Sequence, residues 1–196
     1  MRNIFIFLIG AGLWAGATGC GSSAEADSPA SATTVRPAYF PLKEYLDAQA
    51  TRLNQQQPPV EKRVTLRGSA PETTRVPKIE WDKELQVFYQ ADINKPALRG
   101  AYAVDSTTLP NGTRQILYTR KPGFDNAVVR LTVVRDASGV RSVDATLQKN
   151  NPLFYSEKKL QLRGQAGTLD AYQVQGVQKL VLFDTLRYAT NARVVR

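Results

Sequence analysis

The sequence predicts an α+β domain in which two N-terminal helices pack on a C-terminal antiparallel β-meander, built as an open sheet or an incomplete barrel. Three observations lead to this prediction. Apolar residues recur at helical spacing between residues 41 and 93. Short segments of alternating apolar and polar residues, separated by turn sequences, follow from residue 102 onward. Segments predicted as helices that precede segments predicted as strands are typical of an α+β fold.

The chain begins with a stretch typical of an export signal. Arg2 precedes an apolar run over residues 4–14, and small residues lead from this run to Cys20. The run is too short to cross a bilayer as a helix, which needs about 20 residues. A basic start, an apolar centre and a small-residue cleavage zone are the parts of a secretory signal. We therefore expect residues 1–19 to be a signal peptide.

The end of this signal resembles a bacterial lipobox, over residues 17–20 (ATGC). In such proteins the cysteine is lipidated and becomes the first residue of the mature chain. The alternative is ordinary cleavage after residues 15–17, which would leave Cys20 as a free thiol. Cys20 is the only cysteine, and lipidation explains why an exported chain carries one without a partner. The resemblance implies a lipid-anchored protein of the cell envelope, and Gly21 and Ser22 favour the outer membrane.

The rest of the chain divides into a tether and one domain. Residues 20–37, which begin with the lipidated cysteine, are mostly small and polar, and we expect a disordered tether because such a composition buries too little apolar surface to order itself. Residues 38–196 are expected to form a single globular α+β domain, since that length can bury a core.

Helical patterns occur twice in this domain, with one strand between them. Residues 41–56 place leucines on one face and end before Pro58 and Pro59. Residues 79–93 place Trp81, Leu85, Phe88 and Tyr89 on one face. Between the two, residues 60–67 alternate weakly and predict a strand.

The remaining sequence predicts strands joined by short turns. Asn111-Gly112 lies in the first turn, and this dipeptide is the strongest short hairpin signal. The expected strands cover residues 102–107, 113–121, 128–135, 140–149, 154–163, 169–177, 179–183 and 186–195.

Composition excludes several classes of site. The chain has no histidine and a single cysteine, which excludes Cys/His zinc sites and Ser-His-Asp triads. We expect no metal, no cofactor and no catalytic residue. Carboxylates on residues 79–93 leave a hydrolase as an alternative, although they fit the solvent-facing side of a helix; they are Glu80, Asp82, Glu84 and Asp92.

Basic residues outnumber acidic ones, and the formal net charge is +9. Several basic residues fall on adjoining predicted hairpins: Arg130, Arg135, Arg141, Lys158, Lys159 and Arg163. They form either a patch for an anionic partner or an ordinary solvated sheet face. We do not expect nucleic acid as a partner, because no binding motif is present and the export signal predicts a location outside the cytoplasm.

Aromatic side chains supply the candidate ligand site between the second helix and the sheet. Tyrosine and tryptophan combine an apolar body with a polar tip, which suits an amphiphilic ligand. The candidates are Trp81, Tyr89, Tyr102, Tyr118, Tyr155 and Tyr172. The alternative interpretation places them in the core or at its rim.

Four short motifs resemble a family of uncharacterised Bacteroidetes-type lipoproteins. The motifs lie at residues 81–85 (WDKEL), 92–96 (DINKP), 102–105 (YAVD) and 154–157 (FYSE). The resemblance implies a lipoprotein with an intact domain and implies no activity. By analogy of fold, a helix-covered antiparallel sheet on a lipid anchor is similar to lipoprotein carriers that hold acyl chains in an apolar concavity.

These observations favour a non-enzymatic envelope lipoprotein that binds an apolar or lipidic ligand, or a partner protein. A structural or assembly lipoprotein without a small ligand is the alternative. A cavity of several hundred Å³ lined by apolar side chains would favour the ligand-binding interpretation.

Overall fold

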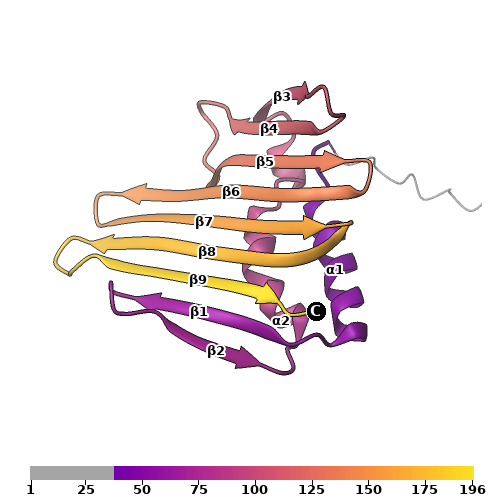
Figure 1. Cartoon of the computed structure of the whole chain (residues 1–196). Coiled ribbons are helices and arrows are strands. Elements are labelled where there is room, and N and C mark those ends of the chain that lie inside the picture. Colours follow the sequence, from indigo (N-terminus) through magenta and orange to yellow (C-terminus); the bar gives the residue numbers. More distant parts are fainter. Residues whose placement is uncertain (1–37) are drawn as a thin grey trace, which may run out of the picture. The chain divides into compact units, whose positions relative to one another are not determined.

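The computed structural model describes residues 38–196 (Figure 1). The expected signal peptide, the lipidation of Cys20 and the expected tether lie outside the described residues. Among residues 38–196, no helix is both long enough and apolar enough to cross a membrane.

Nine strands form one antiparallel sheet in the order β2-β1-β9-β8-β7-β6-β5-β4-β3 (Figure 1). Strands β3 to β9 follow one another as a meander. The β1–β2 hairpin adds to the far side of β9, so that the sheet is open, with edges at β2 and β3. The strands are β1 (Val60–Leu66), β2 (Glu72–Val76), β3 (Tyr102–Thr108), β4 (Arg114–Arg120), β5 (Val128–Asp136), β6 (Gly139–Asn151), β7 (Phe154–Gln165), β8 (Thr168–Leu180) and β9 (Leu186–Val194).

The antiparallel sheet is confirmed, but the predicted fold class is wrong. The chain folds mostly as one nine-stranded sheet with short helices, rather than as two N-terminal helices followed by a meander. Two of the strands, β1 and β2, lie before the second helix in sequence, so the helical and strand regions are not separate. The sequence predicted β1 but missed β2. Strand β2 (ETTRV) is short and almost entirely exposed, and it has no apolar face that a sequence pattern could reveal.

The second helical segment is also shorter than predicted, and most of it is not an α-helix. Helix α1 (Leu42–Gln56) matches its pattern, whereas α2 (Trp81–Glu84) has a single turn and continues as the 3₁₀ helix η1 (Leu85–Ala91). A second 3₁₀ turn, η2 (Pro96–Leu98), follows. Buried residues in η1 recur every three positions, at Leu85, Phe88 and Ala91, which is the 3₁₀ period rather than the α period.

One further strand boundary was wrong. Residues 179–183 were predicted as a separate strand, but β8 continues to Leu180, and a turn follows in which the Phe183 amide donates to the Leu180 carbonyl (3.2 Å). The residues Leu180–Phe183 have high β propensity, yet no neighbouring strand extends far enough to pair with the last three of them.

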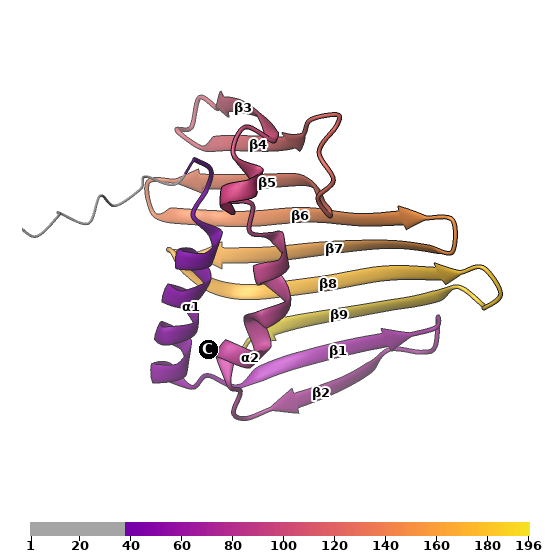
Figure 2. The ribbon, with the colours of Figure 1, turned by 180° about the vertical axis from the view of Figure 1, so that it is seen from behind.

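The helices cover one face of the sheet (Figure 2). Residues directly opposite one another on antiparallel strands share a face, so each row of pairs can be followed across the sheet. One such row under the helices contains Ala192, Tyr172, Leu162, Val143 and Val133. All five are buried, and together with Trp81 and Phe88 they fill the space between the two layers.

Two polar side chains fasten the helical layer to its surroundings. The Gln49 amide nitrogen donates to the Gly167 carbonyl (3.0 Å), and its oxygen accepts from the Leu169 amide (2.8 Å). Gln49 thereby ties α1 to the β7–β8 turn. Asn94 accepts from the Tyr39 amide (3.0 Å) and donates to the Phe40 carbonyl (2.7 Å), which holds the segment before α1 against the end of η1.

Candidate binding surface

In the described part of the chain, no helix covers the other face of the sheet (Figure 1), and we call it the bare face. Its composition follows from strand alternation, because each residue next to a core position points outward. One row across this face reads Thr65, Ala189, Gln175, Lys159, Thr146 and Arg130. A neighbouring row reads Arg63, Asn191, Gln173, Gln161, Asp144 and Thr132. The face is therefore polar across most of its width.

Basic side chains outnumber acidic ones on the bare face. The register places there the basic residues Arg63, Arg75, Arg130, Lys159, Arg163, Lys179, Arg187 and Arg193 and the acidic residues Glu61, Asp105, Asp144 and Glu157. Of the basic group expected on adjoining hairpins, Arg130, Lys159 and Arg163 share this face. Lys158 points to the opposite face, and Arg141 pairs with Asp136 (3.4 Å).

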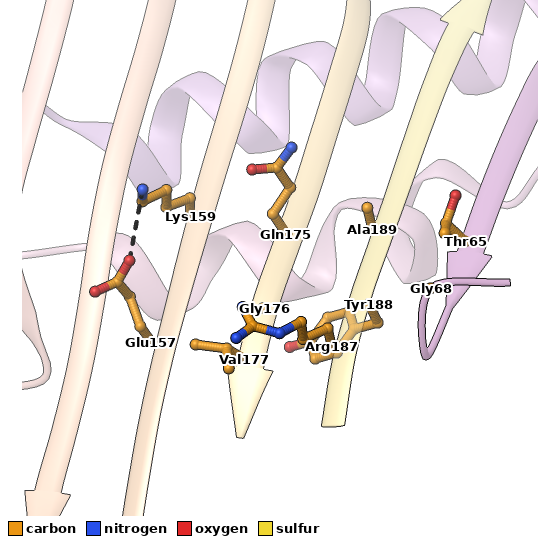
Figure 3. A pocket seen from close by; sticks show the side chains of 10 residues that line it. All are labelled: Thr65, Gly68, Glu157, Lys159, Gln175, Gly176, Val177, Arg187, Tyr188 and Ala189. Carbon is orange, nitrogen blue, oxygen red and sulfur yellow. Dashed lines mark ion pairs between the residues drawn. The ribbon is translucent and has the colours of Figure 1, made fainter. Parts of the chain in front are cut away.

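Glu157 is at the centre of a hydrogen-bonded cluster on the bare face. Its Oε2 accepts from the Gln148 amide (2.9 Å) and the Tyr155 hydroxyl (3.0 Å), and its Oε1 lies 3.5 Å from Lys159 Nζ (Figure 3). The hydrogen bonds from Gln148 and Tyr155 lower the pKa of the Glu157 carboxyl, since they stabilise its charged form. The hydrogen bond to Glu157 raises the pKa of Tyr155. At neutral pH, Glu157 is therefore a carboxylate and Tyr155 a neutral phenol.

A second fixed pair lies on the same face. Arg163 donates to both oxygens of Asp144, from Nη1 (3.0 Å) and from Nη2 (2.8 Å). Such two-point contacts hold the guanidinium plane in a defined orientation. Part of the bare face is thus pre-ordered.

Two hollows open on the bare face, where small residues interrupt the long side chains. One, of about 310 Å³, is floored by Gly176 and Ala189 and bordered by Lys159 and Arg187 (Figure 3). The other, of about 300 Å³, is floored by Ala171 and bordered by polar and basic side chains, among them Arg63, Gln161, Arg163, Asn191 and Arg193. Both are surface depressions of a size that accepts a protruding side chain.

A larger hollow, of about 1160 Å³, lies on the opposite face beyond the end of η1. Most of its lining residues are polar, among them Gln90, Lys149 and Lys158, and Ala127, Leu147 and Phe154 are apolar. Lys158 Nζ donates to Gln90 Oε1 (2.9 Å) across the hollow. Burial first, and then the charge of Lys149, lowers the pKa of Lys158.

The six aromatic candidates do not meet in one site. Trp81, Tyr102, Tyr118 and Tyr172 are buried in the core. Tyr89 lies at the helix layer and donates to Asp47 Oδ1 (2.5 Å), whereas Tyr155 lies on the bare face.

The hydroxyl groups of the buried tyrosines Tyr102 and Tyr172 form hydrogen bonds within the domain. Tyr102 donates to the Val128 carbonyl (2.8 Å), and Tyr172 donates to Glu84, whose other oxygen pairs with Lys62 (2.7 Å). Burial and the hydrogen bond to Glu84 raise the pKa of Tyr172. Within residues 38–196, the indole N–H of Trp81 has no acceptor.

The four carboxylates of the second helical segment also remain apart. Glu80 pairs with Lys83 (2.5 Å), Asp82 accepts from Asn54 (2.6 Å), Glu84 pairs with Lys62, and Asp92 accepts from the Asn94 amide (3.1 Å). Each of them has a structural partner of its own. In the described residues, no cluster of three or more Asp, Glu, Cys or His side chains is placed to hold a metal ion.

Sequence reasoning missed the cluster around Glu157. It also missed Tyr188, a residue that contributes to the lining of both the bare-face hollow and the larger hollow. A usable signal existed for the cluster. Tyr155, Glu157 and Lys159 alternate along β7, and they therefore had to share one face.

Comparison with known proteins gives no relative from which a role could be transferred. No protein-family model, no curated protein and no solved structure matches this chain. The resemblance to Bacteroidetes-type lipoproteins therefore stays a prediction.

Proposed function

We propose that this chain is a non-enzymatic lipoprotein of the cell envelope, anchored through Cys20, whose bare face binds a partner protein with an acidic surface. The single observation that carries the proposal is the bare face itself. It is wide, polar and net basic, and part of it is ordered by the two-point Arg163–Asp144 contact and by the hydrogen bonds to Glu157. The lipid anchor and the envelope location rest on the sequence alone.

Charge complementarity is the main argument for an acidic partner. Opposite surface potentials raise association rates and disfavour wrong partners. The hollows floored by Gly176 and Ala171 would receive side chains of the partner, and the basic residues around them would face its carboxylates.

A partner protein fits the geometry better than a lipidic ligand held inside the domain. The space between helices and sheet is filled by Trp81, Phe88 and the leucines packed around them. The three described hollows are open surface depressions bordered by charged and polar side chains, and none of the three is an enclosed apolar cavity. We therefore expect no saturable binding of a fatty-acyl probe in the interior.

Site-specific photo-crosslinking in cells tests this proposal. A benzoylphenylalanine at Gln175, on the bare face, should give a discrete adduct, whereas the same residue at Gln86, exposed on η1, should not. The charge reversals Lys159→Glu and Arg187→Glu should abolish the adduct. Lys78→Glu, on a loop before α2, is the matched control and should leave it intact. Equal labelling from Gln175 and Gln86 would refute a specific bare-face partner.

A further inference from the structure

The most exposed large apolar side chains of the described chain gather at one end of the sheet. Leu182 is 91% exposed, Leu153 is 72% exposed and Phe183 is 71% exposed. They belong to the β6–β7 and β8–β9 turns, which project beyond the helical layer (Figure 1). We call this group the apolar tip, and it consists of Leu153, Leu180, Val181, Leu182 and Phe183.

The apolar tip is held in a defined shape by hydrogen bonds. The Val181 amide donates to the Leu153 carbonyl (3.2 Å), which joins the two turns. Within the β6–β7 turn, the Leu153 amide donates to Asn151 Oδ1 (3.0 Å). The backbone at the crest is therefore hydrogen-bonded within and between the two turns, and it presents these side chains outward.

Basic side chains stand directly behind the apolar tip on both faces of the sheet. Lys179 and Arg187 lie on the bare face, and Lys149 lies on the opposite face at the rim of the larger hollow. All three are exposed, and within residues 38–196 none of them forms an ion pair. Asp184 is the one acidic residue between Leu180 and Arg187.

We propose that the apolar tip inserts into the interfacial region of an anionic lipid bilayer, with Lys149, Lys179 and Arg187 against the headgroups. Leucine and phenylalanine at a convex crest suit the boundary between acyl chains and headgroups. Basic residues just behind that crest meet the negative potential of anionic lipids. The order of chemistry along the protrusion, apolar first and basic next, matches the order of layers in a membrane surface.

This contact is separate from the lipid expected on Cys20, and it shares Arg187 with the bare face. It would make the tip a second attachment point that orients the sheet relative to the membrane. The variants used below change the tip and two lysines behind it but leave Arg187 intact, so failure of membrane contact and failure of partner binding are distinguishable.

Tryptophan placed at the crest tests the proposal in the full-length chain. Phe183→Trp is compared with Leu109→Trp. Leu109 is an exposed leucine in the β3–β4 turn, at the other edge of the sheet. The emission of the parent chain, which contains Trp14 and Trp81, is subtracted from each spectrum. Each variant is mixed with vesicles of phosphatidylglycerol and phosphatidylcholine in equal parts, or of phosphatidylcholine alone, with or without lipids brominated on their acyl chains.

We expect the tryptophan at position 183 to shift to shorter emission wavelength and to lose most of its emission to the brominated lipid, while the tryptophan at position 109 does neither. Adding Leu182→Ser should reduce the quenching in all vesicles. Adding both Lys149→Gln and Lys179→Gln should reduce it only in vesicles that contain phosphatidylglycerol. Equal quenching at positions 183 and 109 would overturn the proposal. So would sedimentation showing that the tip is covered by a second copy of the chain. Circular dichroism confirms that each variant is folded before its result is counted.

Discussion

The ring of Tyr188 lies over Gly176, its direct partner across strands β8 and β9. A methyl group added at Gly176 would overlap that ring. Glycine in a strand contributes no side chain of its own, and a cross-strand aromatic ring that covers it restores the packing. Burial against the sheet also raises the pKa of the Tyr188 phenol.

Gly176→Ala should push the Tyr188 ring outward into solvent. Because an exposed phenolate is better solvated, the pKa of Tyr188 should fall toward its ordinary value of about 10. Titration of the tyrosine Cζ resonance by nuclear magnetic resonance measures this change. The stability loss should be modest, about 1 kcal/mol, since the ring is free to rotate away. An unaltered titration of Tyr188 would show that the ring does not depend on Gly176.

Gly164→Ala should cost more than Gly176→Ala. A Cβ at Gly164 would lie 2.5 Å from the Val140 carbonyl oxygen, and this glycine follows a register shift between β7 and β8. Backbone rather than a side chain blocks the methyl group, so the strands must move apart, at about 1–3 kcal/mol. Urea unfolding of the two variants side by side gives the comparison. A Gly164 variant as stable as the parent would contradict the close approach.

Gln49→Leu should destabilise the domain although leucine suits a buried helix position. The change leaves the Leu169 amide without its acceptor, and a buried unsatisfied donor costs about 1–3 kcal/mol. The Gly167 carbonyl keeps a second donor, Arg52 Nη1 (3.2 Å), and loses less. Gln56→Leu, at an exposed position of the same helix, is the matched control and should change the free energy of unfolding little. Equal midpoints for both variants would refute this role of Gln49.

Stability should decrease at alkaline pH, in part because of Tyr45. Burial raises the pKa of Tyr45 to about 12, whereas the unfolded chain ionises near 10. Below pH 10 the phenol is protonated in both the folded and the unfolded state, and the contribution of Tyr45 to the free energy of unfolding is fully present. As the pH rises from 10 to 12, the unfolded state releases the proton first, so the free energy of unfolding falls. Urea midpoints across this interval should fall less steeply for Tyr45→Phe, and identical slopes would argue against burial of that phenol.

Cys20→Ala should release the protein from the membrane fraction without unfolding the domain. A lipid anchor supplies attachment through its acyl chains, and a single contact of the apolar tip would be weaker and salt-sensitive. Fractionation after a high-salt wash measures the difference. If the variant still sediments with outer membranes, the lipobox interpretation is wrong.

Sequence patterns were most informative where one residue type has one structural role. Asn111 and Gly112 lie in the turn of the first meander hairpin, where Gly112 has φ 76°, a conformation that glycine adopts without a steric penalty. Alternation along β6 likewise separated the buried Val143, Ala145 and Leu147 from their half-buried neighbours.

The failures have physical causes that a single sequence does not display. Strand β2 exists because β1 offers it a pairing edge, and pairing leaves no apolar signature in Glu72–Val76. The β propensity of residues 181–183 suggested a strand, but propensity cannot form one without a partner. The aromatic candidates lie in the core, in the helix layer and on the bare face. The sequence could not show this, because a list of aromatic residues does not reveal which side of its helix or strand each one occupies.

The pairing of β1 with β9 has a consequence for how the domain is made. Val60 lies opposite Val194, so a strand from the start of the domain finds its partner only in the last one. During synthesis, the β1–β2 hairpin must wait until the rest of the sheet exists, with its pairing edge exposed to other chains in the meantime. Such long-range pairing slows folding. Loss of the final residues would therefore remove β9 and leave β1 and β2 without a connection to the rest of the sheet. Such a truncated chain should aggregate rather than form a smaller sheet.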